Sequence, residues 1–167
     1  DLSAGIDLGN LEQLVRMKNE SEIESSDQHI VNAVEFMLQH AFDTRASDIH
    51  VEPKRDFSLI RFRIDGVLHD IQSIPKIVHA AILSRLKTLS RLDIAEKRRP
   101  QDGRIKTTRA GKEIELRVST LPVAFGEKIV MRIFDPDVLM QDLSGLGFYP
   151  EETVVFNEFI TRPHGII

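Results

Sequence analysis

The sequence predicts an α+β fold of two layers, in which helices cover one face of an antiparallel β-sheet. Apolar residues recur with helical spacing in two segments and alternate with polar residues in several others. Two dipeptides, Asp65-Gly66 and Ala110-Gly111, connect alternating segments and are typical of hairpin turns. Strands with one polar face need cover on the other face only, and the two helices can supply that cover.

Composition narrows the function classes. The 167 residues are 41% hydrophobic and 29% charged, which is ordinary for a globular protein with one core. Cysteine is absent and the six histidines show no metal-ligand spacing, so we expect no disulfide and no metal site. No apolar run is long enough to span a bilayer, so we expect no membrane insertion.

The first half of the chain predicts a tail, two helices and three strands. The tail or linker covers residues 1–26, and it holds a candidate short helix around Leu11, Leu14 and Val15. A helix over residues 28–43 follows Asp27, which is a typical helix cap. We expect strands over residues 46–53, 60–64 and 67–74, and then a helix over 75–92 that Pro75 opens.

The second half predicts three more strands and a change of organisation. The strands cover residues 103–108, 112–120 and 127–134, and Asp135-Pro136 ends the sheet. A linker with Gly145 and Gly147 precedes a helix over about residues 150–161, and Ile166-Ile167 resemble the beginning of a strand.

Charge is distributed unevenly along the chain. Residues 1–56 carry 5 basic and 12 acidic side chains, whereas residues 97–132 carry 10 basic and 4 acidic ones. Such a contrast suggests an anionic ligand near the basic stretch. The alternative is a pair of solvated faces that partly neutralise each other.

Strand alternation places several of the basic residues on one sheet face. If the apolar residues of the strands face the helices, the side chains that face away are those of Arg61, Arg63, Arg104, Lys106, Arg117 and Arg132. Guanidinium groups stay charged and match phosphate oxygens, so this face suits a polyphosphate, with few carboxylates nearby. The alternative is that Glu113 and Glu115 pair with these arginines as ordinary surface ion pairs.

Other polar residues are less suggestive of chemistry. Asp48 and His50 share a strand face and can hydrogen-bond, but no nucleophile accompanies them. Ser119-Thr120 lacks a nearby base, and Asp102 is expected in a turn before a strand. The chain also contains no phosphate loop of the form GxxxxGK[ST]. We therefore expect no complete catalytic site within these 167 residues.

A series of ordered motifs carries a resemblance to a known family. The motifs are Ala46-Ser47-Asp48-Ile49-His50-Val51-Glu52, Arg61-Phe62-Arg63-Ile64-Asp65-Gly66, Leu92-Asp93-Ile94-Ala95-Glu96-Lys97-Arg98, Pro100-Gln101-Asp102-Gly103-Arg104, Leu116-Arg117-Val118-Ser119-Thr120, Gly126-Glu127-Lys128, Val130-Met131-Arg132 and Arg162-Pro163-His164-Gly165-Ile166-Ile167. Over residues 28–167 the chain resembles the amino-terminal domain of the assembly ATPases of bacterial type II secretion and type IV pili.

The resemblance implies a domain organisation and a function. A PAS-like regulatory domain covers residues 27–135, a linker 136–148, and the start of a RecA-like ATPase domain 149–167, which ends just before the Walker A loop. In the full-length protein the ATPase domain binds ATP and Mg²⁺, whereas this fragment alone binds neither tightly. The regulatory domain closes on the ATPase domain and supplies arginines to the terminal phosphate. The matching residues are Arg104 and Arg117, and Arg132 is a weaker third candidate.

The resemblance also implies partners and a location. Family members are homo-hexamers in which each regulatory domain contacts its own ATPase domain and that of a neighbouring subunit. They work in the cytoplasm, next to the inner-membrane platform proteins, to drive secretion or pilus extension. The motifs leave those two processes open. A stand-alone PAS-like sensor for a small ligand or partner is the alternative, and nucleic acid is not expected because aromatic residues make up only 6%.

Overall fold

The computed structural model describes residues 23–135 and 141–167. The chain divides into two compact units, Asp1–Phe134 and Asp135–Ile167. The candidate helix around Leu11 and the first five residues of the predicted linker lie outside the described residues.

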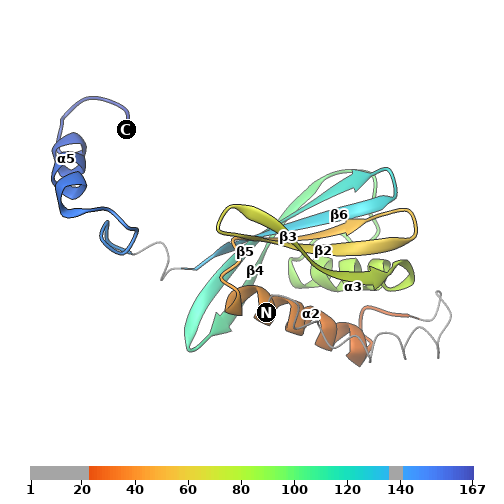
Figure 1. Ribbon diagram of the computed structural model, residues 1–167. Coiled ribbons are helices and arrows are strands. Elements are labelled where there is room, and N and C mark those ends of the chain that lie inside the picture. The colour runs from red at the N-terminus through yellow and green to blue at the C-terminus, as the bar shows by residue number, and fades with distance from the viewer. Residues whose placement is uncertain (1–22, 136–140) are drawn as a thin grey trace. The chain divides into compact units, whose positions relative to one another are not determined.

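The first unit is built on a six-stranded antiparallel sheet. Its strands are β1 (Asp48–Pro53), β2 (Phe57–Ile64), β3 (Val67–Pro75), β4 (Gln101–Arg109), β5 (Lys112–Val123) and β6 (Gly126–Phe134). The spatial order is β3-β2-β1-β6-β5-β4, so that the first and last strands of the unit pair at the centre of the sheet (Figure 1). This arrangement confirms the predicted antiparallel sheet.

Two-residue turns close the hairpins as the sequence predicts. Asp65 and Gly66 have φ values of 49° and 83°, and Ala110 and Gly111 have values of 49° and 79°. Positive φ at both central positions is the signature of a type I′ turn, whose twist matches that of the flanking strands. Each turn therefore sets the register of its hairpin, and with it the side chains that share a face.

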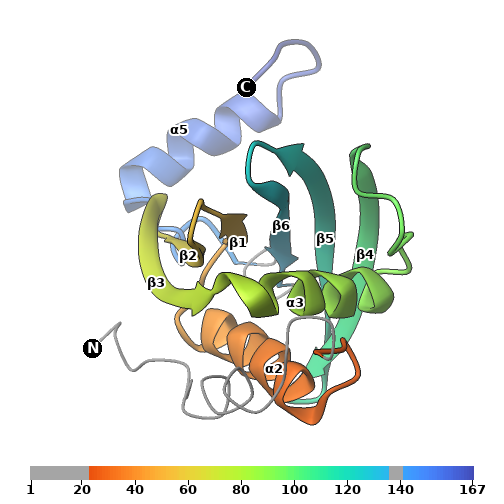
Figure 2. The same cartoon turned by 90° about the vertical axis from the view of Figure 1, so that its right-hand side faces the viewer.

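Two helices, α2 (Gln28–Asp43) and α3 (Lys76–Leu89), lie on the same side of the sheet (Figures 1 and 2). Their apolar stripes pack on the alternating apolar side chains of the strands and form one core. The fully buried members of that core include Ile30, Val34, Ile49, Phe62, Leu86, Leu116 and Met131. The fold is the two-layer α+β architecture that the sequence predicts. We call the opposite side of the sheet, which neither α2 nor α3 covers, the open face.

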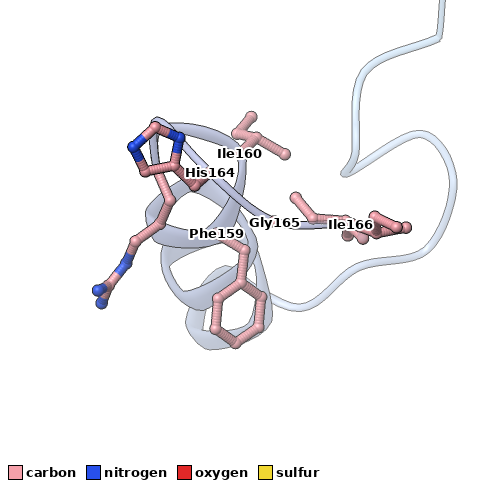
Figure 3. Close-up of a pocket in the computed structure, with 7 residues that line it drawn as sticks. Phe159, Ile160, His164, Gly165 and Ile166 are labelled. Carbon is pink, nitrogen blue, oxygen red and sulfur yellow. The ribbon is translucent and has the colours of Figure 1, made fainter.

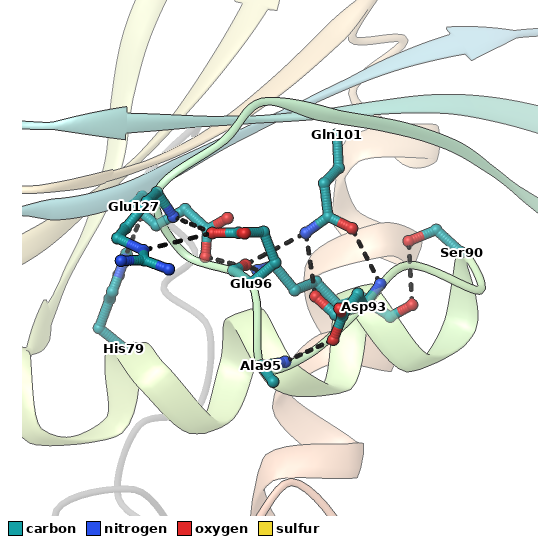
Figure 4. Close-up of polar contacts among 9 residues, drawn as sticks. His79, Ser90, Asp93, Ala95, Glu96, Gln101 and Glu127 are labelled. Atoms are coloured by element: carbon teal, nitrogen blue, oxygen red, sulfur yellow. Dashed lines mark hydrogen bonds and ion pairs between the residues drawn. The ribbon is translucent and has the colours of Figure 1, made fainter.

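A polar network lies between α3 and the sheet (Figure 4). The Lys87 side chain is only 1% exposed, and its Nζ lies 2.7 Å from Oε2 of Glu127 and donates to the carbonyl of Glu96 at 2.6 Å. His79 Nε2 donates to the Glu127 carbonyl at 2.8 Å. Its Nδ1 then accepts from the Ser58 hydroxyl at 2.7 Å. Strand β6, helix α3 and the loop after it are thus joined by buried polar contacts.

The loop that follows α3 is held by its own side chains. Gln101 closes it: its Oε1 accepts from the Asp93 N–H at 2.9 Å, and its Nε2 donates to the Asp93 carbonyl at 2.9 Å. Asp93 Oδ1 accepts from the Ala95 N–H, and Glu96 Oε1 accepts from the Arg98 N–H. The loop that leads into β4 is therefore fixed by hydrogen bonds from its own side chains.

Among the described residues of the second unit there is one helix, α5 (Pro150–Ile160), preceded by a turn around Gly147. Its position agrees with the predicted helix, but none of its residues is buried. Ile166 and Ile167, which the sequence predicts as the beginning of a strand, have no regular structure because no described strand pairs with them. In the part of the chain that the structure describes, no helix is long and apolar enough to cross a membrane.

Candidate functional site

Three arginines occupy directly paired positions on adjacent strands. Arg104 on β4 is opposite Arg117 on β5, and Arg117 is opposite Arg132 on β6. Opposite side chains of an antiparallel pair lie on the same face, with Cβ atoms about 4.5–5.5 Å apart. The flanking residues Leu116 and Met131 are buried in the core, so the three arginines lie on the open face. We call Arg104, Arg117 and Arg132 the arginine row.

The arginine row is exposed and works against the stability of the sheet. The three side chains are 69%, 66% and 66% exposed. Like charges directly opposite each other destabilise a sheet, and this row repeats such a pairing twice. Placement of like charges that the fold does not need is typical of a binding or catalytic surface.

Each member of the row contacts at least one neighbour that orients it. Arg132 Nε lies 2.8 Å from Oδ1 of Asp48. The Arg117 guanidinium lies over the ring of Phe134, 4.4 Å from its centroid, an attractive cation–π arrangement. Arg104 and Arg117 both approach Glu115, at 3.8 Å and 3.9 Å.

The expectation that few carboxylates lie near the arginines is therefore wrong. Asp48 and Glu115 stand on the same face, because their strands bring them there in register. The alternative of ordinary surface ion pairs is realised by Lys106, whose Nζ lies 2.8 Å from Oε1 of Glu113, and by Arg61, whose Nε lies 2.9 Å from Oδ1 of Asp70. The contacts of Glu115 with Arg104 and Arg117 are long, and they leave both guanidinium groups exposed.

Asp48 is the most buried charged residue on the open face, with 3% exposure. It lies between two arginines: Arg132 Nε reaches Oδ1, and Arg63 Nε lies 3.3 Å from Oδ2, where the Ser47 hydroxyl also donates at 2.8 Å. Burial alone raises the pKa of this carboxyl. The hydrogen bonds from Arg132 and Ser47, with the charges of Arg132 and Arg63, outweigh burial and lower the pKa. Asp48 is therefore ionised.

The possible hydrogen bond between Asp48 and His50 is not formed. His50 Nδ1 lies instead 3.7 Å from Oε1 of Glu52, while Asp48 is taken up by arginines from both neighbouring strands. Burial, followed by the charge of Lys128, lowers the pKa of His50, against the opposing effect of Glu52. The Asp48–His50 pair therefore does not form a catalytic dyad.

The other polar residues that the sequence analysis considered are structural. Asp102 belongs to β4 rather than to a turn, because the strand begins two residues earlier than expected, and its Oδ1 accepts from the Ser119 hydroxyl. Thr120 is fully buried in the core. The Thr120 hydroxyl has no hydrogen-bond partner, and the Ser119 hydroxyl meets the Asp102 carboxylate without a histidine beside it among the described contacts.

The second unit offers a hollow of about 660 Å³ around Phe159, Ile160 and His164 (Figure 3). All of the side chains that line it are exposed, and it contains no buried polar group that would select a ligand. Within residues 23–135 and 141–167 there is also no cluster of side chains that would hold a metal ion. The arginine row is therefore the better candidate site.

The chain is similar to proteins of known kind. The family model described as "Type II/IV secretion system protein" matches residues 23–167. The chain is 50% identical over 158 residues to the type IV pilus assembly ATPase TfpB of Acinetobacter baylyi, which covers 94% of this chain and 27% of the relative.

Two further relatives carry secretion names. Type II secretion system protein E of Xanthomonas campestris pv. campestris is 43% identical over 143 residues, covering 86% of this chain and 25% of the relative. The protein of the same name from Pseudomonas aeruginosa is 38% identical over 167 residues, covering 100% of this chain and 33% of the relative. The chain spans only a quarter to a third of the length of these relatives. The match of the family model over nearly the whole chain confirms the resemblance drawn from the motifs, and the chain belongs to the type II/IV secretion system protein family.

Proposed function

We propose that this chain is the regulatory part of an ATPase that drives type II secretion or type IV pilus assembly. In this proposal residues 27–135 form the regulatory domain, residues 136–148 a linker, and residues 149–167 the start of the ATPase domain. Of the relatives reported above, one is named as a type IV pilus assembly ATPase and two are named as type II secretion system proteins. The observation that carries the proposal is the arginine row.

The row fits a polyphosphate in charge and in chemistry. Three permanently charged guanidinium groups stand side by side, and each can donate two parallel hydrogen bonds to phosphate oxygens. ATP with Mg²⁺, bound by the ATPase domain, would supply the phosphoryl group. Arg104 and Arg117 would approach its terminal phosphate when the two domains close, with Arg132 beside them. Their positive charge would stabilise the negative charge that develops there during transfer.

The wider setting is part of the same proposal. The protein would act as a homo-hexamer in the cytoplasm, with the regulatory domain contacting its own ATPase domain and that of a neighbouring subunit. Closure, which ATP favours and product release reverses, would be passed to the inner-membrane platform as a movement of rigid units. Held tightly by its core, the sheet would carry the arginines without deforming.

The test is the ATPase activity of the full-length protein that contains this chain. We expect Arg104→Ala and Arg117→Ala to lower kcat by about 10²-fold or more, with a modest change in nucleotide Kd. Lys106→Ala is the matched control, because Lys106 lies two residues from Arg104 on the same strand face but off the row. Unchanged kcat in both arginine variants would remove the proposed role. We also expect the 167-residue chain alone to show no ATP turnover.

A further inference from the structure

We propose that Asp48 is a positioning residue for the arginine row, whose carboxylate holds Arg132 beside Arg117 so that the row presents three guanidinium groups rather than two. The inference rests on the proposed function, since it concerns how the same surface meets a phosphate. An acidic residue is unexpected on a face that binds anions, and the proposed role explains why Asp48 lies there.

Asp48 continues the row across the sheet. In the strand register it stands opposite Arg132 on β6 and opposite Arg63 on β2. One register position thus runs over five adjacent strands as Arg63, Asp48, Arg132, Arg117 and Arg104. Asp48 is the one carboxylate in this series, and it lies between Arg63 on β2 and Arg132 on β6.

The contact leaves Arg132 able to bind a phosphate. The Arg132 guanidinium meets Asp48 through Nε, at 2.8 Å. A guanidinium bound through Nε retains a second edge, formed by its two terminal nitrogens, and that edge matches two phosphate oxygens. The exposure of the Arg132 side chain, 66%, agrees with a group that is fixed near its base and open at its end.

Arg63, the other arginine on Asp48, is held differently. Its Nε lies 3.3 Å from Asp48, and its Nη1 donates to the Gly66 carbonyl at 2.9 Å. The side chain is anchored from two sides and only 35% exposed. Asp48 therefore orients Arg132 towards solvent. Arg63 supplies the second positive charge beside the carboxylate.

Glu52 provides the comparison that separates positioning from simple stabilisation. It lies on the same strand and the same face, and its side chain is 12% exposed against 5% for Asp48. Its oxygens are also shared by cations, with Lys54 Nζ and Lys128 Nζ both at 3.0 Å. Each of the two carboxylates is largely buried and has two cationic side chains within 3.3 Å, but only Asp48 touches the arginine row.

The experiment measures kcat and thermal stability in the full-length protein. We expect Asp48→Asn to lower kcat by about 10-fold, because loss of the charge frees Arg132 to move by an ångström or more. Glu52→Gln should change kcat by less than about 2-fold, although it should lower Tm by as much as Asp48→Asn does. In a double-mutant cycle, Asp48→Asn should add little to Arg132→Gln, since both remove the same phosphate contact. Equal losses in Asp48→Asn and Glu52→Gln, or full additivity with Arg132→Gln, would overturn the inference.

A second readout is independent of catalysis. In the 167-residue chain, whose first unit has its own core, the Nε–H signal of Arg132 in a ¹⁵N–¹H spectrum should shift and exchange faster in Asp48→Asn and stay unchanged in Glu52→Gln. An unchanged signal in Asp48→Asn would contradict the contact itself. If Arg104→Ala and Arg117→Ala lower kcat but Asp48→Asn does not, the inference fails alone. If none of the three lowers kcat, the proposed function fails with it.

Discussion

Replacement of Lys87 by methionine tests how far the buried polar network stabilises the first unit. In the native chain the Lys87 ammonium contacts the Glu127 carboxylate at 2.7 Å and the Glu96 carbonyl at 2.6 Å. Lys87→Met keeps the length and the apolar stem of the side chain but removes both contacts. The Glu127 side chain is left at 6% exposure without its cation.

The expected loss follows from what remains in place. Removal of one partner of a buried ion pair costs about 3–5 kcal/mol, because the other charge stays buried. The other carboxylate oxygen of Glu127, Oε1, has no hydrogen-bond partner that could stabilise the remaining charge. The Glu96 carbonyl is better placed, because Gln101 Nε2 still donates to it at 3.2 Å. We therefore expect a decrease in the free energy of unfolding of about 3–4 kcal/mol, a large share of the 5–15 kcal/mol typical of a domain.

Urea unfolding of the 167-residue chain, followed by far-UV circular dichroism, measures this free energy. The double variant Lys87→Met/Glu127→Met should recover most of the loss, because it removes the stranded charge and fills the same space. Lys106→Met, which breaks an exposed pair with Glu113, is the control and should change the midpoint little. The reasoning is refuted if Lys87→Met is as mild as Lys106→Met, or if the double variant is no more stable than the single one.

Two further predictions concern the same unit. Burial lowers the pKa of His79, more than its bond to the Glu127 carbonyl and the Glu127 charge raise it. Its contribution to stability is therefore complete above the unfolded pKa of about 6.5 and is lost as pH falls below that value. Urea unfolding at pH 7.5 and 5.5 should show this decrease in the native chain and a smaller one in His79→Gln. A Cβ at Gly103 would lie 2.6 Å from the Ser90 carbonyl oxygen and 2.8 Å from Leu92 Cδ2, so Gly103→Ala should destabilise by about 1–3 kcal/mol. A Tm equal to that of the native chain would show that the loop can yield.

Local patterns were sufficient to predict the secondary structure and the open face. The helix over residues 28–43 and the hairpin turns at Asp65-Gly66 and Ala110-Gly111 are each encoded within a few neighbouring residues. The alternation of Leu116 with Arg117 likewise shows that the arginine faces away from the core. What alternation cannot show is register, which depends on how distant strands pair. The predicted turn at Ala110-Gly111 is enough to place Arg104 opposite Arg117, but that Arg132 stands opposite Arg117 emerged only from the structure.

Contacts between distant residues were the part that the sequence could not supply. Asp48 and Arg132 are separated by 84 positions, and neither carries a local sign of the other. Phe134, whose ring lies under Arg117, likewise gave no signal of its own, whereas the strand pattern did indicate Glu115 as a neighbour of the arginines. For Lys87 a weak signal exists, because His79, Leu83 and Lys87 are spaced four residues apart and so line one side of α3. A basic residue in such a column indicates a buried partner, but only the fold identifies it as Glu127.

The strand order has a consequence for how the unit is assembled. The sheet consists of two three-stranded meanders, β1-β2-β3 and β4-β5-β6. In each meander, strand pairing can begin at the turns and extend outward. They are joined only where β1 meets β6, over four residue pairs that end at Asp48 and Arg132. Closing this seam brings together segments from opposite ends of the unit, which makes it the slow, entropically costly step of folding. A nascent chain can therefore complete its open face only after β6 has been synthesised.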